Sequence, residues 1–142
     1  MAAAGAEPPI SAGRLATLKC RKDFQSVRQG SRWSTRVFVL EGRQRMAAAG
    51  PAQPRFGFTV ARAVGGAVER NRVRRRLKAA VGSVQMTHAR DDFDYVVIAR
   101  RAVLEAKFAD LVRELTQALN RVHRRARERH DVRARGATEK HS

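Results

Sequence analysis

The 142-residue sequence predicts an α+β or α/β sandwich around one small sheet, and three patterns support this fold class. Apolar and polar residues alternate in Trp33–Leu40 and in Arg55–Val60, as they do in half-buried strands. Asp94–Ala99 is a nearly continuous apolar run of strand length, which is typical of a central strand. Leu104–Val122 carries apolar residues at the 3.6-residue period of an amphipathic helix. The length suits a single domain with a core of its own.

The first half of the chain is expected to contain a short helix and two paired strands. The helix spans Leu18–Gln29, where apolar side chains recur at spacings of four and three residues. The strand at Arg55–Val60 is expected to pair antiparallel with the strand at Trp33–Leu40. Gly42–Pro54 is rich in Gly, Ala and Pro and is expected to form the loop between them.

A strongly basic helix is expected to begin near Ala67 and to run to Val81, before a polar turn through Ser83–Asp92. Its apolar positions lie on one stripe, which would face the core: Val73, Leu77, Ala80 and Val81. The opposite face would display Asn71, Arg72, Arg74, Arg75 and Lys78, with Arg70 and Arg76 flanking the stripe. Like charges three and four residues apart repel each other, so a polyanion would relieve this strain. The alternative is a solvated charged face without a partner.

The net charge of +17 and the pI near 11.8 favour a polyanionic partner, foremost a nucleic acid. An anionic membrane is the competing partner, but no run approaches the roughly 18 apolar residues of a spanning helix, and we expect no membrane contact. Residues 81–120 carry a net charge of −1, so we expect this segment to act as scaffold.

The chain is expected to divide into three parts. Residues 1–12 would be a disordered lead-in, residues 13–122 a nucleic-acid-binding domain, and residues 123–142 a basic, disordered tail. Cys20 is the only cysteine, so no intramolecular disulfide can form, and a reducing, cytoplasmic location is expected.

No constellation of catalytic or metal-binding residues is apparent. The four histidines are far apart in sequence and have no metal-ligand spacing. Asp91, Asp92 and Asp94 could hold Mg²⁺, but a solvated turn is the favoured alternative. Cys20 fits packing better than nucleophilic catalysis. We therefore expect no catalytic residue and no metal ligand on the protein itself.

Two segments together resemble the bacterial ribonuclease P protein subunit: RFGFTVARAVGGAVERNRVRRRLKAA and, some fifteen residues later, DYVVIARR. The resemblance covers roughly Arg14–Arg125, and its most specific part is Ala67-Val68-x-Arg70-Asn71-Arg72-x-x-Arg75. It implies an α-β-β-β-α-β-α two-layer sandwich, with one further strand between Thr35 and Val60. It also implies that the basic helix lies in a left-handed β-α-β crossover, against the usual hand of such connections.

The resemblance further implies a subunit of the ribonucleoprotein endonuclease that removes the 5′ leader of precursor tRNA. The RNA subunit would be the catalyst and would bind most of the Mg²⁺, and no other protein partner would be required. Guanidinium groups would contact phosphates of the catalytic RNA. The residues expected to bind it are Arg62, Arg70, Asn71, Arg72, Arg74, Arg75 and Lys78. Two alternatives stay open: a non-catalytic structural RNA-binding protein of the ribosome-associated type, and a protein-only nuclease.

The resemblance also implies a cleft for the precursor-tRNA leader between the first helix and the sheet. Phe24 would stack on an unpaired base, and Val37 and Val39 would share one strand face that forms the floor. The alternative for Phe24 is a plain core residue. Arg28 and Glu41 stand where relatives often carry aromatic rings, which weakens the expected stacking. Relatives usually carry Ser-Lys-Lys where this chain has Ala61-Arg62-Ala63, so one of the two cations is kept, at Arg62, and the other is lost.

Overall fold

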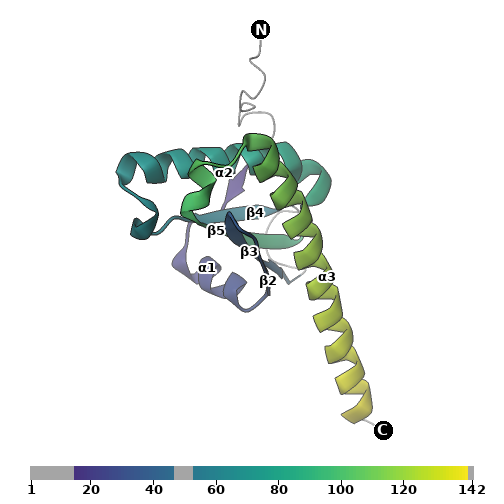
Figure 1. Ribbon diagram of the computed structural model, residues 1–142. Coiled ribbons are helices and arrows are strands. Elements are labelled where there is room, and N and C mark those ends of the chain that lie inside the picture. Colours follow the sequence, from purple (N-terminus) through teal and green to yellow (C-terminus); the bar gives the residue numbers. More distant parts are fainter. Residues whose placement is uncertain (1–14, 47–52, 141–142) are drawn as a thin grey trace.

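The computed structural model describes residues 15–46 and 53–140, with side chains up to residue 132, and these residues form one five-stranded sheet and three α-helices (Figure 1). The helices are α1 (Arg21–Arg28), α2 (Ala67–His88) and α3 (Phe108–Lys140). The strands are β1 (Ala16–Thr17), β2 (Ser31–Ser34), β3 (Phe38–Gln44), β4 (Arg55–Thr59) and β5 (Phe93–Ala99). Short 3-10 turns lie at η2 (Arg62–Val64) and η3 (Arg101–Leu104). From α1 onward the order is the predicted α-β-β-β-α-β-α, and β1 precedes it.

The apolar segment at residues 93–99 is the central strand, as predicted. The strand order is β1-β4-β5-β3-β2, and β5 pairs antiparallel with β3 and parallel with β4. The predicted antiparallel pairing of residues 55–60 with residues 33–40 is wrong, because β4 pairs only with β5 and β1, in parallel. Helix α2 connects β4 to β5, so the basic helix lies in a parallel β-α-β crossover, whose hand stays a prediction.

The single strand predicted at Trp33–Leu40 is in fact two strands joined by a tight turn. The hydroxyl of Thr35 accepts hydrogen bonds from the backbone N–H groups of Val37 (3.2 Å) and Phe38 (3.0 Å) and donates to the carbonyl of Phe38 (2.8 Å). These bonds reverse the chain, so β2 pairs antiparallel with β3. Strand β3 is the further strand expected between Thr35 and Val60, and it takes up the first residues of the predicted loop.

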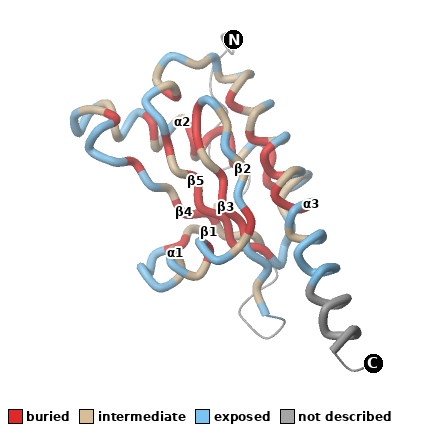
Figure 2. Tube along the Cα trace, turned by 60° about the horizontal axis from the view of Figure 1, so that its bottom comes forward, coloured by how far each residue is buried: buried red, intermediate tan, exposed pale blue. Residues whose placement is uncertain are grey.

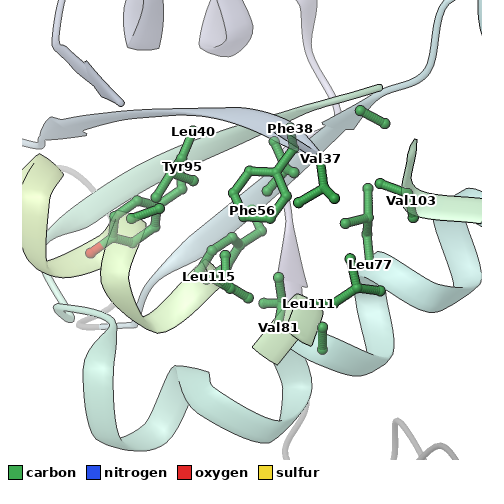
Figure 3. Close-up of a cluster of buried hydrophobic side chains, with 14 of the residues drawn as sticks. Val37, Phe38, Leu40, Phe56, Leu77, Val81, Tyr95, Val103, Leu111 and Leu115 are labelled. Carbon is green, nitrogen blue, oxygen red and sulfur yellow. The ribbon is translucent and has the colours of Figure 1, made fainter. Parts of the chain in front are cut away.

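The main core lies between the sheet and the pair of helices α2 and α3, while α1 covers part of the opposite sheet face (Figures 1 and 2). Phe38, Leu40, Phe56 and Tyr95 fill the sheet side of this core (Figure 3). The predicted apolar stripe of the basic helix faces them, with Val73, Leu77, Ala80 and Val81 all buried. The α+β fold with one sheet is therefore confirmed.

Helix boundaries differ from prediction at several points. Helix α1 begins at Arg21, because Leu18 follows β1 and packs under the helix. Helix α2 runs to His88 because Val84 and Gln85 extend its buried face, so no turn begins at Ser83. Leu104 lies in η3 rather than in the last helix.

Helix α3 continues through residues 123–140, which belong to the segment that the sequence analysis expects to be a basic, disordered tail. His123 is only 7% exposed and shares a 2.6 Å hydrogen bond with the Tyr95 hydroxyl, which shows that the core continues past the predicted boundary. The expected lead-in, residues 1–12, lies outside the described residues. Within the described ranges, no helix has the length and apolar character needed to cross a membrane.

Candidate nucleic-acid interface

The first turns of α2 present a cationic face to solvent. Arg72, Arg75 and Asn71 are exposed, and Arg74 and Lys78 are half-buried. The Asn71 side-chain oxygen accepts a hydrogen bond from Nη1 of Arg74 at 3.2 Å, so Asn71 orients a neighbouring cation. This face encloses a hollow of about 420 Å³ lined by Val68, Asn71, Arg74, Arg75 and Lys78. The structure therefore brings together most of the side chains that the sequence analysis assigned to RNA.

Arg62 and Arg70, the other two predicted cations, differ in their surroundings. Arg62 is exposed in η2, the turn that leads into α2. Arg70 is half-buried, and its Nε is buried without a hydrogen-bond partner among the described residues. A buried N–H that lacks an acceptor is costly, so Nε of Arg70 weakens the packing of this turn slightly.

Glu69 is the only acidic residue in the first turn of α2, and its carboxylate is engaged by the scaffold. One oxygen accepts the backbone N–H of Gly66 at 3.2 Å, which caps the helix start. The other lies 3.1 Å from Nη2 of Arg101, whose side chain also binds the Val64 carbonyl. Glu69 thus fixes the position of the helix start through its contacts with Gly66 and Arg101.

The segment after β5 adds a cation that the sequence analysis missed. Arg76 donates hydrogen bonds to the carbonyls of Val103 and Ala106, which holds this segment against α2. A hollow of about 490 Å³ results, and exposed Lys107 lines it together with Arg72 and Arg75. Lys107 is 32 residues beyond Arg75 in sequence, so no local pattern could have linked it to the basic helix. Arg76, Leu104, Glu105 and Ala106 complete the lining.

The sheet face under α1 is the second predicted contact surface. The ring of Phe24 is half-buried in a cluster with Leu18, Val27, Val96 and Ile98. A Cβ atom added to Gly57 would lie 2.6 Å from Cε2 and Cζ of this ring, so the ring rests directly on the glycine backbone. Phe24 is therefore partly a packing residue and partly accessible.

Val39 and Val37 do not share a face, which corrects the predicted cleft floor. Val39 is half-buried on β3 and is paired with Ile98 of β5, which is in turn paired with Thr59 of β4. Val37 lies in the turn before β3, is only 3% exposed, and packs in the main core near Leu77 (Figure 3). The physical reason is the reversal at Thr35, which breaks the strand alternation on which the prediction rested.

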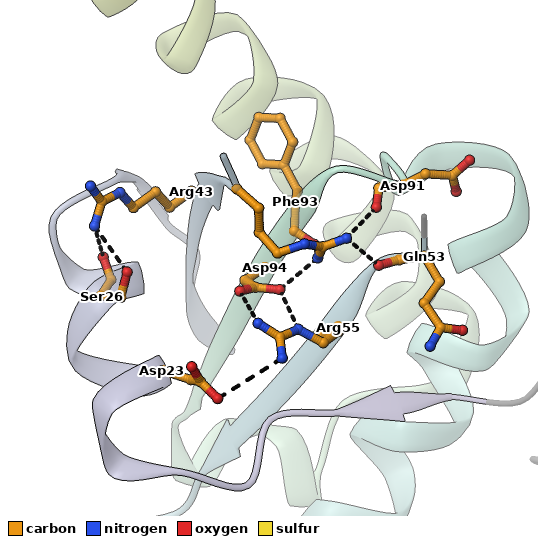
Figure 4. Close-up of polar contacts among 9 residues, drawn as sticks. Asp23, Ser26, Arg43, Gln53, Arg55, Asp91, Phe93 and Asp94 are labelled. Atoms are coloured by element: carbon orange, nitrogen blue, oxygen red, sulfur yellow. Dashed lines mark hydrogen bonds and ion pairs between the residues drawn. The ribbon is translucent and has the colours of Figure 1, made fainter. Parts of the chain in front are cut away.

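A network of ion pairs centred on buried Asp94 links the sheet to α1 at the other end of this face (Figure 4). Asp94 accepts hydrogen bonds from Nε (2.8 Å) and Nη2 (2.7 Å) of Arg55 and from Nη1 (2.7 Å) of Arg45. The hydrogen bond with Asp94 is the main cause that raises the pKa of Arg55. Arg55 also lies 4.0 Å from Asp23 of α1. Asp94 is thus a structural counterion rather than a free ligand.

The metal-binding alternatives find no geometric support in residues 15–46 and 53–132. These side chains contain no group of three His, Cys, Asp or Glu placed to hold a metal ion. Asp92 accepts a 2.5 Å hydrogen bond from Gln44.

Arg28 and Glu41, which stand where relatives often carry aromatic rings, differ in their surroundings. Arg28 is exposed, whereas Glu41 is buried and its carboxylate lies 3.4 Å from Nη2 of Arg32.

Comparison with known proteins agrees with this geometry. The Ribonuclease P family model matches residues 13–130. The ribonuclease P protein component of Paramagnetospirillum magneticum is 42% identical over 113 residues, which cover 78% of this chain and 85% of that protein. The corresponding protein of Brucella suis is 37% identical over 111 residues, covering 75% of this chain and 79% of that protein.

Solved structures show the same fold. The RNase P protein of Thermotoga maritima superposes with a TM-score of 0.61 at 26% identity and covers 76% of this chain and 96% of its own. The RNase P protein of Staphylococcus aureus gives a TM-score of 0.62 at 24% identity, covering 75% of this chain and 94% of its own. Because the family model spans the whole sheet, α1, α2 and most of α3, this chain belongs to the ribonuclease P protein family.

Proposed function

We propose that this chain is the protein component of a cytoplasmic ribonuclease P, an RNA-based endonuclease that removes the 5′ leader of precursor tRNA. In this proposal the RNA subunit performs the cleavage and binds most of the Mg²⁺. The protein supplies no catalytic residue. It neutralises crowded phosphates so that the RNA subunit and the precursor tRNA can approach each other.

The cationic face of α2 is the observation that carries the proposal. Arg72 and Arg75 are exposed, and Lys107 lines a hollow together with them. The exposed guanidinium groups can each donate two parallel hydrogen bonds to one phosphate. Folding gathers these like charges on one face, and binding the phosphates of the RNA subunit would relieve their repulsion.

The second contact in the proposal is made by the sheet face beside α1. Phe24 would stack on an unpaired base of the leader, a contact that tolerates any base. Val39, Ile98 and Thr59 would form the floor, since the register places them side by side across β3, β5 and β4. Val37 is omitted because it is buried in the main core.

Reconstitution tests the proposal directly. The protein is added to an in vitro transcribed ribonuclease P RNA and a precursor tRNA at low Mg²⁺, and 5′ cleavage is followed over time. We expect a gain in cleavage over RNA alone. Absence of a gain would contradict the proposal and favour a structural RNA-binding protein, and cleavage without the RNA subunit would indicate a protein-only nuclease.

A double variant locates the RNA contact. Replacing both Arg72 and Arg75 with Ala should weaken binding to the RNA subunit and reduce the salt slope of log affinity by about two, one for each lost phosphate contact. The matched control replaces Lys19 and Arg113, which are also exposed and lie outside α2. An equal loss in the control would show that only net charge matters and would refute a defined interface on α2.

A further inference from the structure

A second group of arginines lies where α3 passes the outer edge of the sheet. Strand β2 is the edge strand, so carbonyls of alternate residues point away from the sheet. Nη1 of Arg125 donates to the Arg32 carbonyl at 2.7 Å, and Nη1 of Arg129 donates to the Gly30 carbonyl at 2.5 Å. One helical turn advances about 5.4 Å and two strand residues about 6.6 Å, so the two spacings match closely enough for both bonds to form.

The ring of Trp33 fixes the same stretch of α3 from the side. The guanidinium carbons of Arg121 and Arg125 lie 5.1 Å and 4.9 Å from the centroid of the ring. Two cations therefore share one aromatic ring, and the arginines become ordered parts of the fold rather than freely rotating side chains.

Two adjoining hollows lie along this junction, and both are lined by Gly30, Ser31 and Arg129. The first, of about 230 Å³, is also lined by Arg43 and His130. The second, of about 510 Å³, is also lined by Arg32, Arg125, Glu128 and Val132. We call the four arginines Arg32, Arg43, Arg125 and Arg129 the edge-strand arginine cluster.

The edge-strand arginine cluster carries more positive than negative charge. Arg43 is held by the Ser26 carbonyl and hydroxyl and by the Gln29 side chain, all of them neutral groups (Figure 4 shows the Ser26 contacts). Arg125 and Arg129 likewise contact carbonyls, and Arg32 alone has a carboxylate partner, Glu41. Each guanidinium has five N–H donors, so one bond to a carbonyl orients the group and leaves donors for a further acceptor.

We propose that the edge-strand arginine cluster is a second binding site for the phosphate backbone of the catalytic RNA. The site is separate from the cationic face of α2, because β2 and this part of α3 lie across the molecule from the start of α2 (Figure 1). Preoriented guanidinium groups around two adjoining hollows match the repeating phosphates of an RNA strand. The proposal rests on the proposed function, which supplies the RNA.

The experiment measures the affinity of the full chain for ribonuclease P RNA at fixed Mg²⁺ and increasing KCl. Arg43→Gln should weaken binding and reduce the salt slope by about one. Glu128→Gln removes a carboxylate from the second hollow and should strengthen binding. The control is Arg113→Gln. Arg113 is an exposed arginine on α3, the helix that carries Glu128; it pairs with Asp110 and lines neither hollow. Thermal melts show whether each variant is folded.

Opposite effects of Arg43→Gln and Glu128→Gln, with Arg113→Gln close to the parent, would support the site. Parent-like binding by both variants would overturn it, as would an equal loss in Arg113→Gln. Loss of affinity for precursor tRNA alone would overturn the assignment to the catalytic RNA. If the parent chain itself fails to bind ribonuclease P RNA, the proposed function fails, which is a separate result.

Discussion

Gly57→Ala tests the leader contact by moving the ring of Phe24 without changing Phe24 itself. The new Cβ would lie 2.6 Å from Cε2 and Cζ of the ring and 3.3 Å from Cβ of Leu18. Carbon atoms pack at about 3.5 to 4.0 Å, so the ring must shift by about 1 Å or more. Overpacking of this kind costs about 1 to 3 kcal/mol of folding stability.

The functional effect follows from the stacking that the shifted ring loses. Stacking of a base on an aromatic side chain contributes about 1 to 3 kcal/mol, so affinity for a precursor tRNA with a leader should fall by about fivefold to about 150-fold. The assay compares precursor with mature tRNA, bound to the reconstituted holoenzyme. Affinity for mature tRNA and for the catalytic RNA should not change, because α2 and its cations lie on the other side of the sheet and neither Phe24 nor Gly57 lines the hollows of the edge-strand arginine cluster.

Gly82→Ala is the matched control, since a Cβ at this position in α2 meets no atom within 4 Å. It should leave leader discrimination intact. Phe24→Leu keeps an apolar side chain in the cluster but removes the ring, and it should reproduce the loss of discrimination. If Gly57→Ala lowers the melting temperature while precursor and mature tRNA are discriminated as before, Phe24 is a plain core residue and the reasoning is refuted.

Three further predictions concern single residues. Lys107→Gln should reduce the salt slope for catalytic RNA by about one in a filter-binding titration, and an unchanged slope would remove Lys107 from the interface. Burial, with a smaller contribution from Arg90, lowers the pKa of His123 to about 4. The unfolded chain therefore takes up this proton first, near pH 6.5, and about 3 kcal/mol of stability is lost as the pH falls from about 6.5 towards 4. The glutamine in His123→Gln does not titrate, so the variant should lack this part of the loss. Urea unfolding should show a smaller fall in its free energy of unfolding between pH 7 and pH 4.5 than in that of the parent. Asp94→Asn leaves Arg45 without its buried counterion and should destabilise the fold by about 3 kcal/mol in urea; a loss below about 1 kcal/mol would contradict the structural role.

The helices and the central strand were predictable because their signals are local. The stripe of Val73 and Leu77 in α2 and the apolar run of β5 each specify an element without reference to the rest of the chain. Strand partners are not specified in this way, since alternation shows which residues share a face but not which strand lies beside them. This is why the antiparallel partner predicted for β4 was wrong.

Two features of the fold depend on side-chain contacts that no periodicity records. The turn between β2 and β3 contains no Gly or Pro, and the hydroxyl of Thr35 makes it instead, so Val37 was placed on the wrong face. The stretch of α3 after residue 123 is rich in arginine and has few apolar residues, so its sequence does not predict that it contacts the sheet. In the structure Arg125 and Arg129 bond to the carbonyls of Arg32 and Gly30, and Ala126 packs against the core.

The parallel pairing of β4 and β5 explains why Lys107 lies beside the basic helix. Parallel neighbours end at the same edge of a sheet, so the chain leaves both strands on one side of the molecule. After β4 it enters α2 with its arginines, and after β5 it enters η3 and the segment that ends in Lys107. The bonds from Arg76 to Val103 and Ala106 then join the two exits. Strand direction therefore contributes to the cationic face in addition to the arginine-rich sequence, because it places there a cation that the sequence of α2 does not contain.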